Sequence, residues 1–158
     1  MTGPAASGAV GGGSQEREVL AANSRFYAAF ESGDLDAMHE VWVADGHAVC
    51  VHPGWSPVIG AAAVRRSWAV VMAHTPYIQF ILTDVAVVVA ADVASVTCTE
   101  NVLAAADLGR GGGAGQGFAG GKAVTTNVFR RGRNGWRLWI HHASPVLSAA
   151  AAGDEGAR

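Results

Sequence analysis

The segment YIQFILTDVAVVVAADVASVTCTENVLAAA, residues 77–106, decides the fold. Apolar and β-branched residues fill it in a pattern with a period of two, which is typical of β-strands. Ala91-Asp92 interrupts the pattern and predicts a tight turn between strands at Tyr77–Ala90 and Val93–Ala106. The segment therefore predicts two long antiparallel strands that follow one another directly in the chain.

Two more strands are expected nearer the C-terminus, at Lys122–Arg131 and Trp136–Pro145. The glycine-dense segment Leu108–Gly121 precedes them and is expected to be a flexible hairpin loop. It lacks the lysine–serine ending of a phosphate-binding loop, and it joins two strands instead of opening a helix. Arginines flank the turn at Gly132–Gly135, and we interpret them as a solvated hairpin end rather than a phosphate site.

The residues before this β-rich half have helical spacing instead. Apolar side chains recur every three or four residues across Glu16–Ser32, which predicts a helix that Gly33 ends. Asp34 is expected to cap a second, short helix, and a third helix is expected from Gly60 to about His74. Three helices followed by antiparallel strands predict an α+β fold with the helices on one face of a curved sheet.

The chain has 158 residues, enough for one domain with a hydrophobic core. We expect this domain to span Gln15–Leu147. Met1–Ser14 and residues 148–158 are poor in core-forming side chains and are expected to be disordered tails. Met1–Gly13 has neither the basic start nor the apolar block of a signal peptide, so a cytoplasmic location is expected.

Composition argues against several classes of function. The formal net charge of -2 gives no electrostatic support for binding nucleic acid. No apolar run approaches the ~20 residues that would span a bilayer, so no membrane partner is expected. The cysteines Cys50 and Cys98 lie far apart in strand-like runs, and they predict buried free thiols rather than a disulfide scaffold or a zinc site. No metal or other cofactor is expected.

The stretch Cys50-Val51-His52-Pro53-Gly54-Trp55 is the main candidate for a binding site. A short strand at His47–His52 ends in a histidine, the chain turns at Pro53-Gly54, and a large aromatic residue follows. Such a combination at the mouth of a strand suits the rim of a small-molecule pocket. His52 is therefore a candidate ligand contact or general base, with a structural role in the pocket wall as the alternative.

Glu100 lies on an apolar strand face with Val96 and Cys98, where an unpaired carboxylate is costly to bury. It is expected either to line a polar cavity or to pair with an inward basic group, for which His142 is the candidate. A shifted register would instead leave Glu100 outside. His141 and His142 face opposite sides of the sheet, so only one of them can reach the pocket.

Aromatic side chains supply the remaining candidates for ligand contact. Phe26 and Tyr27 lie next to each other on the first predicted helix. Trp42, Trp55 and Trp68 are candidates for the pocket wall, with a core or interface role as the alternative.

Several strings resemble the nuclear-transport-factor-2-like superfamily, and most closely its SnoaL-like branch. They are FYAAFESGDLD at residues 26–36, Ile59-Gly60 before the third helix, and GWRLWIHHASP at residues 135–145. The resemblance covers Gln15–Leu147 and implies a cone-shaped α+β fold with a pocket between helices and sheet. This fold hosts isomerases, cyclases, dehydratases, binding modules and oligomerisation domains, so it implies no single function.

Ketosteroid isomerase is a relative whose catalytic positions can be placed on this sequence one at a time. Its tyrosine donor to the oxyanion falls on Phe26, which has no hydroxyl group. Its aspartate base falls on His52, and its protonated aspartate falls on Asn127. The resemblance thus implies a pocket with a histidine base and an amide donor, rather than steroid isomerisation by the same mechanism.

These features predict a small-molecule-binding SnoaL-like protein with an apolar pocket and no assigned reaction. The alternative is a SnoaL-like enzyme that transfers protons on a small cyclic or polyketide-like substrate, with His52 as base, Asn127 as polarising donor and Glu100 beside them. A homodimer through one face of the sheet is also expected, because strands such as Tyr77–Ala90 carry apolar residues on both faces.

Overall fold

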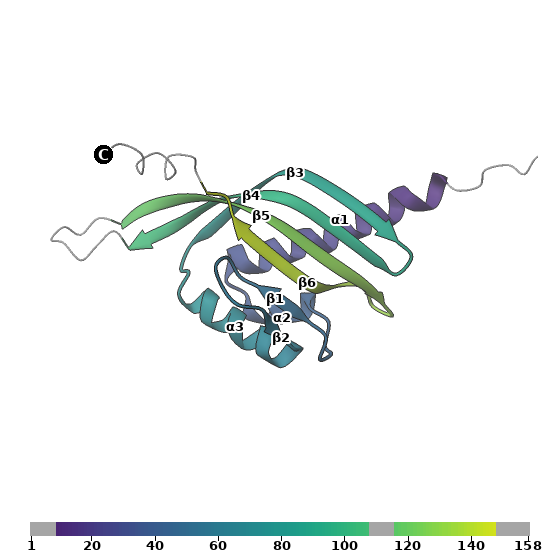
Figure 1. Ribbon diagram of the computed structural model, residues 1–158, viewed down its shortest axis with the longest axis horizontal. Coiled ribbons are helices and arrows are strands. Elements are labelled where there is room, and N and C mark those ends of the chain that lie inside the picture. Colours follow the sequence, from purple (N-terminus) through teal and green to yellow (C-terminus); the bar gives the residue numbers. More distant parts are fainter. Residues whose placement is uncertain (1–8, 108–115, 148–158) are drawn as a thin grey trace, which may run out of the picture.

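A computed structural model describes residues 9–107 and 116–147 of the chain. The elements within these residues are α1 (Ala9–Ser32), α2 (Leu35–Val41), β1 (Val49–Val51), β2 (Val58–Ile59), α3 (Ala61–Ala73), β3 (Ile78–Ala90), β4 (Val93–Asp107), β5 (Gln116–Gly132) and β6 (Gly135–Pro145). The strands form one sheet in the order β2-β1-β6-β5-β4-β3. Neighbouring strands are antiparallel, except that β1 runs parallel to β6. The helices pack on one side of the curved sheet, which confirms the predicted α+β cone fold (Figure 1).

Helix α1 begins at Ala9, seven residues before the predicted start at Glu16. Residues 9–14 continue the helix of the domain, and residues 1–8 and 148–158 lie outside the described part of the chain. Gly33 ends the helix with a φ of 68°, a left-handed conformation that glycine adopts without strain. The predicted cap of α2 is confirmed, because the backbone N–H of Ala37 donates to the Asp34 carboxylate at 2.9 Å.

The predicted β3–β4 turn is confirmed at Ala91, whose φ is 54°. Strand β5 begins at Gln116, so the C-terminal part of the predicted loop Leu108–Gly121 is strand, and residues 108–115 lie outside the described residues. Strand β2 has only two residues, too few for a periodic pattern to predict it. In the described residues, no helix is both long enough and apolar enough to cross a membrane.

A β-bulge in β6 decides which histidine faces the helices. Val128 pairs with Ile140 and Phe129 pairs with Leu138, so Trp139 is an extra residue on β6. One extra residue shifts the alternation of side chains that follows it by one position. As a result, His141 is buried on the inner face, and its neighbour His142 is exposed.

The arginines near the β5–β6 turn make contacts within the chain. Arg130 forms an ion pair with Asp45, and its guanidinium lies 5.4 Å from the centre of the Trp139 ring. Arg131 lies 5.7 Å from the centre of the Trp136 ring. Both stacking distances are within the range of cation–π attraction, so these arginines hold the hairpin end against the domain.

Candidate functional site

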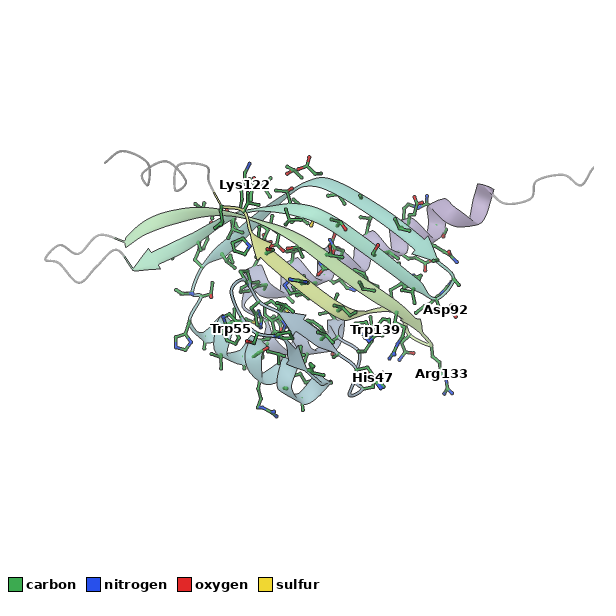
Figure 2. All side chains as sticks on the ribbon, in the orientation of Figure 1. His47, Trp55, Asp92, Lys122, Arg133 and Trp139 are labelled. Carbon is green, nitrogen blue, oxygen red and sulfur yellow. The ribbon has the colours of Figure 1, made fainter. Side chains whose placement is uncertain are left out.

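A cavity of about 320 Å³ lies between the inner face of the sheet and helices α1 and α3. Its walls are mainly aromatic and aliphatic, and the side chains at the mouth include Trp55, which Figure 2 labels beside the loop after β1. The residues that border it are Phe26, Phe30, His52, Pro53, Trp55, Trp68, Val71, Ile78, Phe80, Glu100, Val102, Gly121, Lys122, Ala123, His141, Ala143 and Pro145. A concave, mostly apolar space with a few polar groups is typical of a small-molecule site.

His52 directly follows β1 and is the first residue of the turn that comes after this strand. The backbone N–H of Trp55 donates to the carbonyl oxygen of His52 at 2.9 Å, and Gly54 adopts a φ of 79° to allow the turn. The His52 ring is 3% exposed, and its Nε2 lies 3.0 Å from the hydroxyl of Ser67 on α3. Burial lowers the pKa of His52, so the ring is held neutral near pH 7.

Trp68 is the aromatic centre of the site. Its ring meets His52 edge to face with centroids 4.7 Å apart, and it packs in the same way on Phe26 at 5.3 Å. Trp55 also meets His52 edge to face, at 4.9 Å, so the histidine contacts two indole rings. Edge-to-face packing of this kind restricts ring motion, which fixes the position of the histidine nitrogens.

Glu100 is 5% exposed and points inward from β4, as the alternating pattern predicted. The hydroxyl of Tyr27 on α1 donates a hydrogen bond to its Oε1 at 2.7 Å. Burial raises the pKa of Glu100, and the hydrogen bond from Tyr27 opposes that rise. The same burial, with the nearby Glu100 charge, raises the pKa of Tyr27, so Tyr27 remains a donor.

His141 on β6 is the last member of a chain of buried hydrogen bonds that also includes residues of α1 and β5. Asn127 on β5 donates from its amide nitrogen to Oδ1 of Asn23 on α1 at 2.8 Å, and its Oδ1 lies 2.7 Å from Nδ1 of His141. These three residues are at most 3% exposed. Burial is the main cause that lowers the pKa of His141 to about 3, and the nearby His52 and His142 lower it further. The ring is therefore neutral at physiological pH.

Five of the nine predicted site residues border the cavity, and four do not. His52, Glu100, Phe26, Trp55 and Trp68 all border the cavity. The predicted contact of His142 with the pocket, and its pairing with Glu100, are wrong. The bulge in β6 turns His142 outward, and the inward partner of Glu100 is a tyrosine.

Trp42 does not border the cavity either. It is buried in the core and bridges to Leu138 instead of forming a pocket wall. Tyr27 does not border the cavity, but its hydroxyl donates a hydrogen bond to Glu100, which does. Asn127 lies behind the wall, where its amide nitrogen donates to Asn23, and it does not border the cavity.

The roles of His141, Asn23 and Ser67 were not predicted from the sequence, although Asn23 and Ser67 interrupt apolar helix faces. Asn23 lies within the apolar stripe of the first helix, between Val19 and Phe26. Ser67 lies one turn of helix from the buried Val64. A polar side chain on an apolar helix face needs a buried partner, and each has one at this site.

No cluster of three or more histidine, cysteine or acidic side chains that could hold a metal ion occurs in residues 9–107 and 116–147. Cys50 and Cys98 are buried free thiols in this part of the chain. Burial raises the pKa of Cys50 to about 12, so its thiol is protonated at neutral pH.

The fold and site define an α+β cone protein with a cavity between helices and sheet. A family model described as a SnoaL-like domain matches residues 19–148. The chain belongs to this SnoaL-like family within the nuclear-transport-factor-2-like superfamily. A comparison with curated proteins gave no match.

Several solved structures are similar to the chain. A proposed dehydratase of the NTF2-like family from Streptomyces avermitilis is 43% identical, with a TM-score of 0.79, over 86% of this chain and 99% of that one. A proposed calcium/calmodulin-dependent protein kinase type II association domain from Thiobacillus denitrificans is 33% identical, with a TM-score of 0.67, over 81% of this chain and 94% of that one. An NTF2-like protein from Novosphingobium aromaticivorans, 24% identical with a TM-score of 0.65 over 88% of this chain and 86% of that one, shares the fold.

Proposed function

We propose that the protein binds a small, mainly apolar molecule in the cavity between helices and sheet. The observation that carries this proposal is the composition of the cavity wall, where aromatic rings from α1, α3 and β3 surround a few polar side chains. The volume of about 320 Å³ lies at the lower end of the ~300–1,000 Å³ found for small-molecule sites. The ligand is therefore expected to have one to three rings.

Filling the cavity tests this proposal. Ala123 borders the cavity, and Val124 beside it on β5 points to the outer face. Ala123→Leu should abolish binding of a small aromatic molecule, measured by quenching of tryptophan fluorescence, and Val124→Leu is the matched control that should leave it intact. Equal binding by both variants would show that the ligand does not occupy the cavity.

A second candidate is an enzyme that transfers protons on a small cyclic or polyketide-like substrate. Two observations favour it: neutral histidines border the cavity, and burial raises the pKa of Glu100. A neutral histidine can take a proton from carbon, and a carboxylic acid with a raised pKa can give one to a departing hydroxyl group. In this candidate His52 is the base and Glu100 the acid, and the relative from Streptomyces avermitilis is itself described as a proposed dehydratase.

The probe 3-hydroxy-1-tetralone tests this second candidate. Removal of a proton from C2 and loss of the C3 hydroxyl as water would give an enone, which aromatises to 1-naphthol by moving a proton from C4 to the ketone oxygen, and 1-naphthol fluoresces. Wild-type protein should convert the probe faster than buffer, and His52→Gln should lose most of that rate. A wild-type rate equal to that of buffer would leave binding without turnover as the function.

The proposed oligomeric state is a homodimer formed through the outer face of the sheet. Apolar side chains that are 40–69% exposed lie on that face, on strands β3, β4 and β5: Ile81, Val88, Leu103 and Val124. The helices cover the opposite face (Figure 1). Contiguous exposed apolar surface on a sheet is typical of an interface between proteins.

A further inference from the structure

The hydrogen bonds behind His141 determine which of its ring nitrogens carries hydrogen. Because the Asn127 amide nitrogen donates to Asn23, the oxygen of that amide faces His141. An amide oxygen can only accept, so Nδ1 of His141 must be the N–H donor in this contact. A neutral imidazole has one N–H, and Nε2 of His141 is therefore a bare acceptor. No residue of the described chain donates to this Nε2, and the ring borders the cavity.

A hydrogen bond to Ser67 on α3 likewise determines which ring nitrogen of His52 carries hydrogen. The hydroxyl of Ser67 donates to the carbonyl oxygen of Val64 at 2.8 Å, which uses its only hydrogen. The Ser67 oxygen must then accept from Nε2–H of His52 at 3.0 Å. Nδ1 of His52 is left as an acceptor, and the Cys50 sulfur lies 3.9 Å from it.

The other polar groups around the cavity do not add a donor that faces inward. In its ionised form Glu100 presents only acceptor oxygens, one of which accepts from Tyr27, and its protonated form belongs to the enzymatic alternative. The indole N–H of Trp68 is buried beside Cys50, away from the cavity surface. Lys122 borders the cavity at the sheet, but it is exposed and alternates with the buried Ala123, so its side chain extends toward the outer side of the sheet (Figure 2).

We infer that the cavity is specific for a neutral ring compound that carries at least one hydroxyl group, which donates to Nε2 of His141, and that it excludes carboxylates. This inference rests on the proposed binding function and names the chemical class of the ligand. An apolar wall favours the rings, and a ligand that displaces water from the bare acceptor leaves it unsatisfied unless the ligand itself brings a donor. A carboxylate ligand would instead place its acceptor oxygens against the acceptors of the wall, after losing its water shell.

Asn127 and Asn23 are positioning residues in this inference, and their role can be measured without any ligand. Long-range ¹H–¹⁵N correlation spectra of the free protein distinguish the two neutral tautomers of a histidine. Wild-type His141 should be the Nδ1–H tautomer, and Asn127→Asp should keep it, since a carboxylate accepts from the same N–H. Asn127→Leu should shift His141 toward the Nε2–H tautomer. Asn23→Leu, which frees the Asn127 amide to rotate, gives a second test if Asn127→Leu fails to fold. A wild-type His141 in the Nε2–H form would overturn the inference.

Four matched probes then test the ligand class: 2-naphthol, 2-methoxynaphthalene, naphthalene and 2-naphthoate. 2-Naphthol should bind about 3- to 10-fold more tightly than 2-methoxynaphthalene, since only the first can donate. 2-Naphthoate should bind at least about 10-fold more weakly than 2-naphthol. In Asn127→Leu or Asn23→Leu the preference for 2-naphthol should disappear.

The possible outcomes separate this inference from the proposed function. Equal affinity for 2-naphthol, 2-methoxynaphthalene and naphthalene would refute the inference and leave an apolar binding function intact. Tighter binding of 2-naphthoate would also refute it, and would indicate that Lys122 reaches the ligand. Failure of all four probes to bind would refute the proposed function and, with it, the assignment of a ligand class.

Discussion

Replacing Tyr27 by phenylalanine should destabilise the protein by an amount that depends on pH. The substitution removes one hydroxyl group, which is buried and donates to Glu100 at 2.7 Å. A hydrogen bond to a charged group contributes about 1.5–3 kcal/mol to stability, and a bond between neutral groups about 0.5–1.5 kcal/mol. Tyr27→Phe should therefore cost about 1.5–3 kcal/mol where Glu100 is ionised and about half as much where it is protonated.

The sign of the pH dependence follows from the pKa of Glu100. Burial raises this pKa in the folded state, so the folded protein holds the Glu100 proton more tightly than the unfolded chain does. The unfavourable contribution of Glu100 is therefore absent below its unfolded pKa and complete above its folded pKa. Wild-type stability should fall as pH rises through this window, and Glu100→Gln should remove that part of the slope. Tyr27→Phe should raise the folded pKa further and widen the window.

Urea denaturation of wild type, Tyr27→Phe, Glu100→Gln and the double variant measures these effects as a double-mutant cycle at several pH values. The Tyr27 hydroxyl also lies 3.6 Å from the Cys98 sulfur. The free energy of that contact cancels in the cycle, because Tyr27→Phe loses it whether or not Glu100 is also replaced. We expect a coupling free energy of about 1–3 kcal/mol at neutral pH. A coupling near zero, with a loss in Tyr27→Phe that does not vary with pH, would show that the hydroxyl does not stabilise a buried carboxylate.

Further predictions concern the surface, the thiols and the bulge. Light scattering at micromolar concentration should give the mass of a dimer, and Ile81→Glu or Val88→Glu on the exposed sheet face should give a monomer; a wild-type monomer would contradict the interface. Cys50 and Cys98 should not react with a thiol reagent at pH 8 until the protein unfolds, because both are buried and the pKa of Cys50 is about 12. Rapid labelling of the native protein would argue against this burial. Deletion of Trp139 should remove the bulge and lower the melting temperature by no more than about as much as Trp139→Ala does, because without the extra residue His141 follows Leu138 by two positions and stays on the inner face. A much larger loss in the deletion than in Trp139→Ala would argue against a bulge at this position.

The sequence predicted side-chain directions correctly where strands are regular. On β4, strict alternation placed Val96, Cys98 and Glu100 on one face, and the structure buries all three. On β6 the same rule failed, because the bulge at Trp139 adds one residue and exchanges the roles of His141 and His142. A bulge depends on pairing with the neighbouring strand, and a single sequence carries little sign of that pairing.

The polar network of the site was harder to predict for a different reason. Asn23 and Ser67 each interrupt an apolar helix face, which is a visible sign that a buried partner exists. The identity of that partner depends on tertiary packing across 104 residues for Asn23 and across 15 residues for Ser67. Trp42 shows the same limit, since its apolar surroundings predicted burial but could not distinguish the core from the cavity wall.

The direction of hydrogen bonding in the cavity limits the chemistry that it could support. Stabilising a negative charge on a ligand oxygen requires N–H or O–H donors that face the ligand. Phe26 has no hydroxyl at the position that resembles the tyrosine of ketosteroid isomerase, and the Asn127 amide donates to Asn23 behind the wall. His52 and His141 offer unprotonated nitrogens instead. Under the enzymatic alternative, this arrangement favours an elimination in which the proton and the hydroxyl leave together over an isomerisation through an enolate. A hydroxylated ring is therefore the substrate to test before a simple ketone.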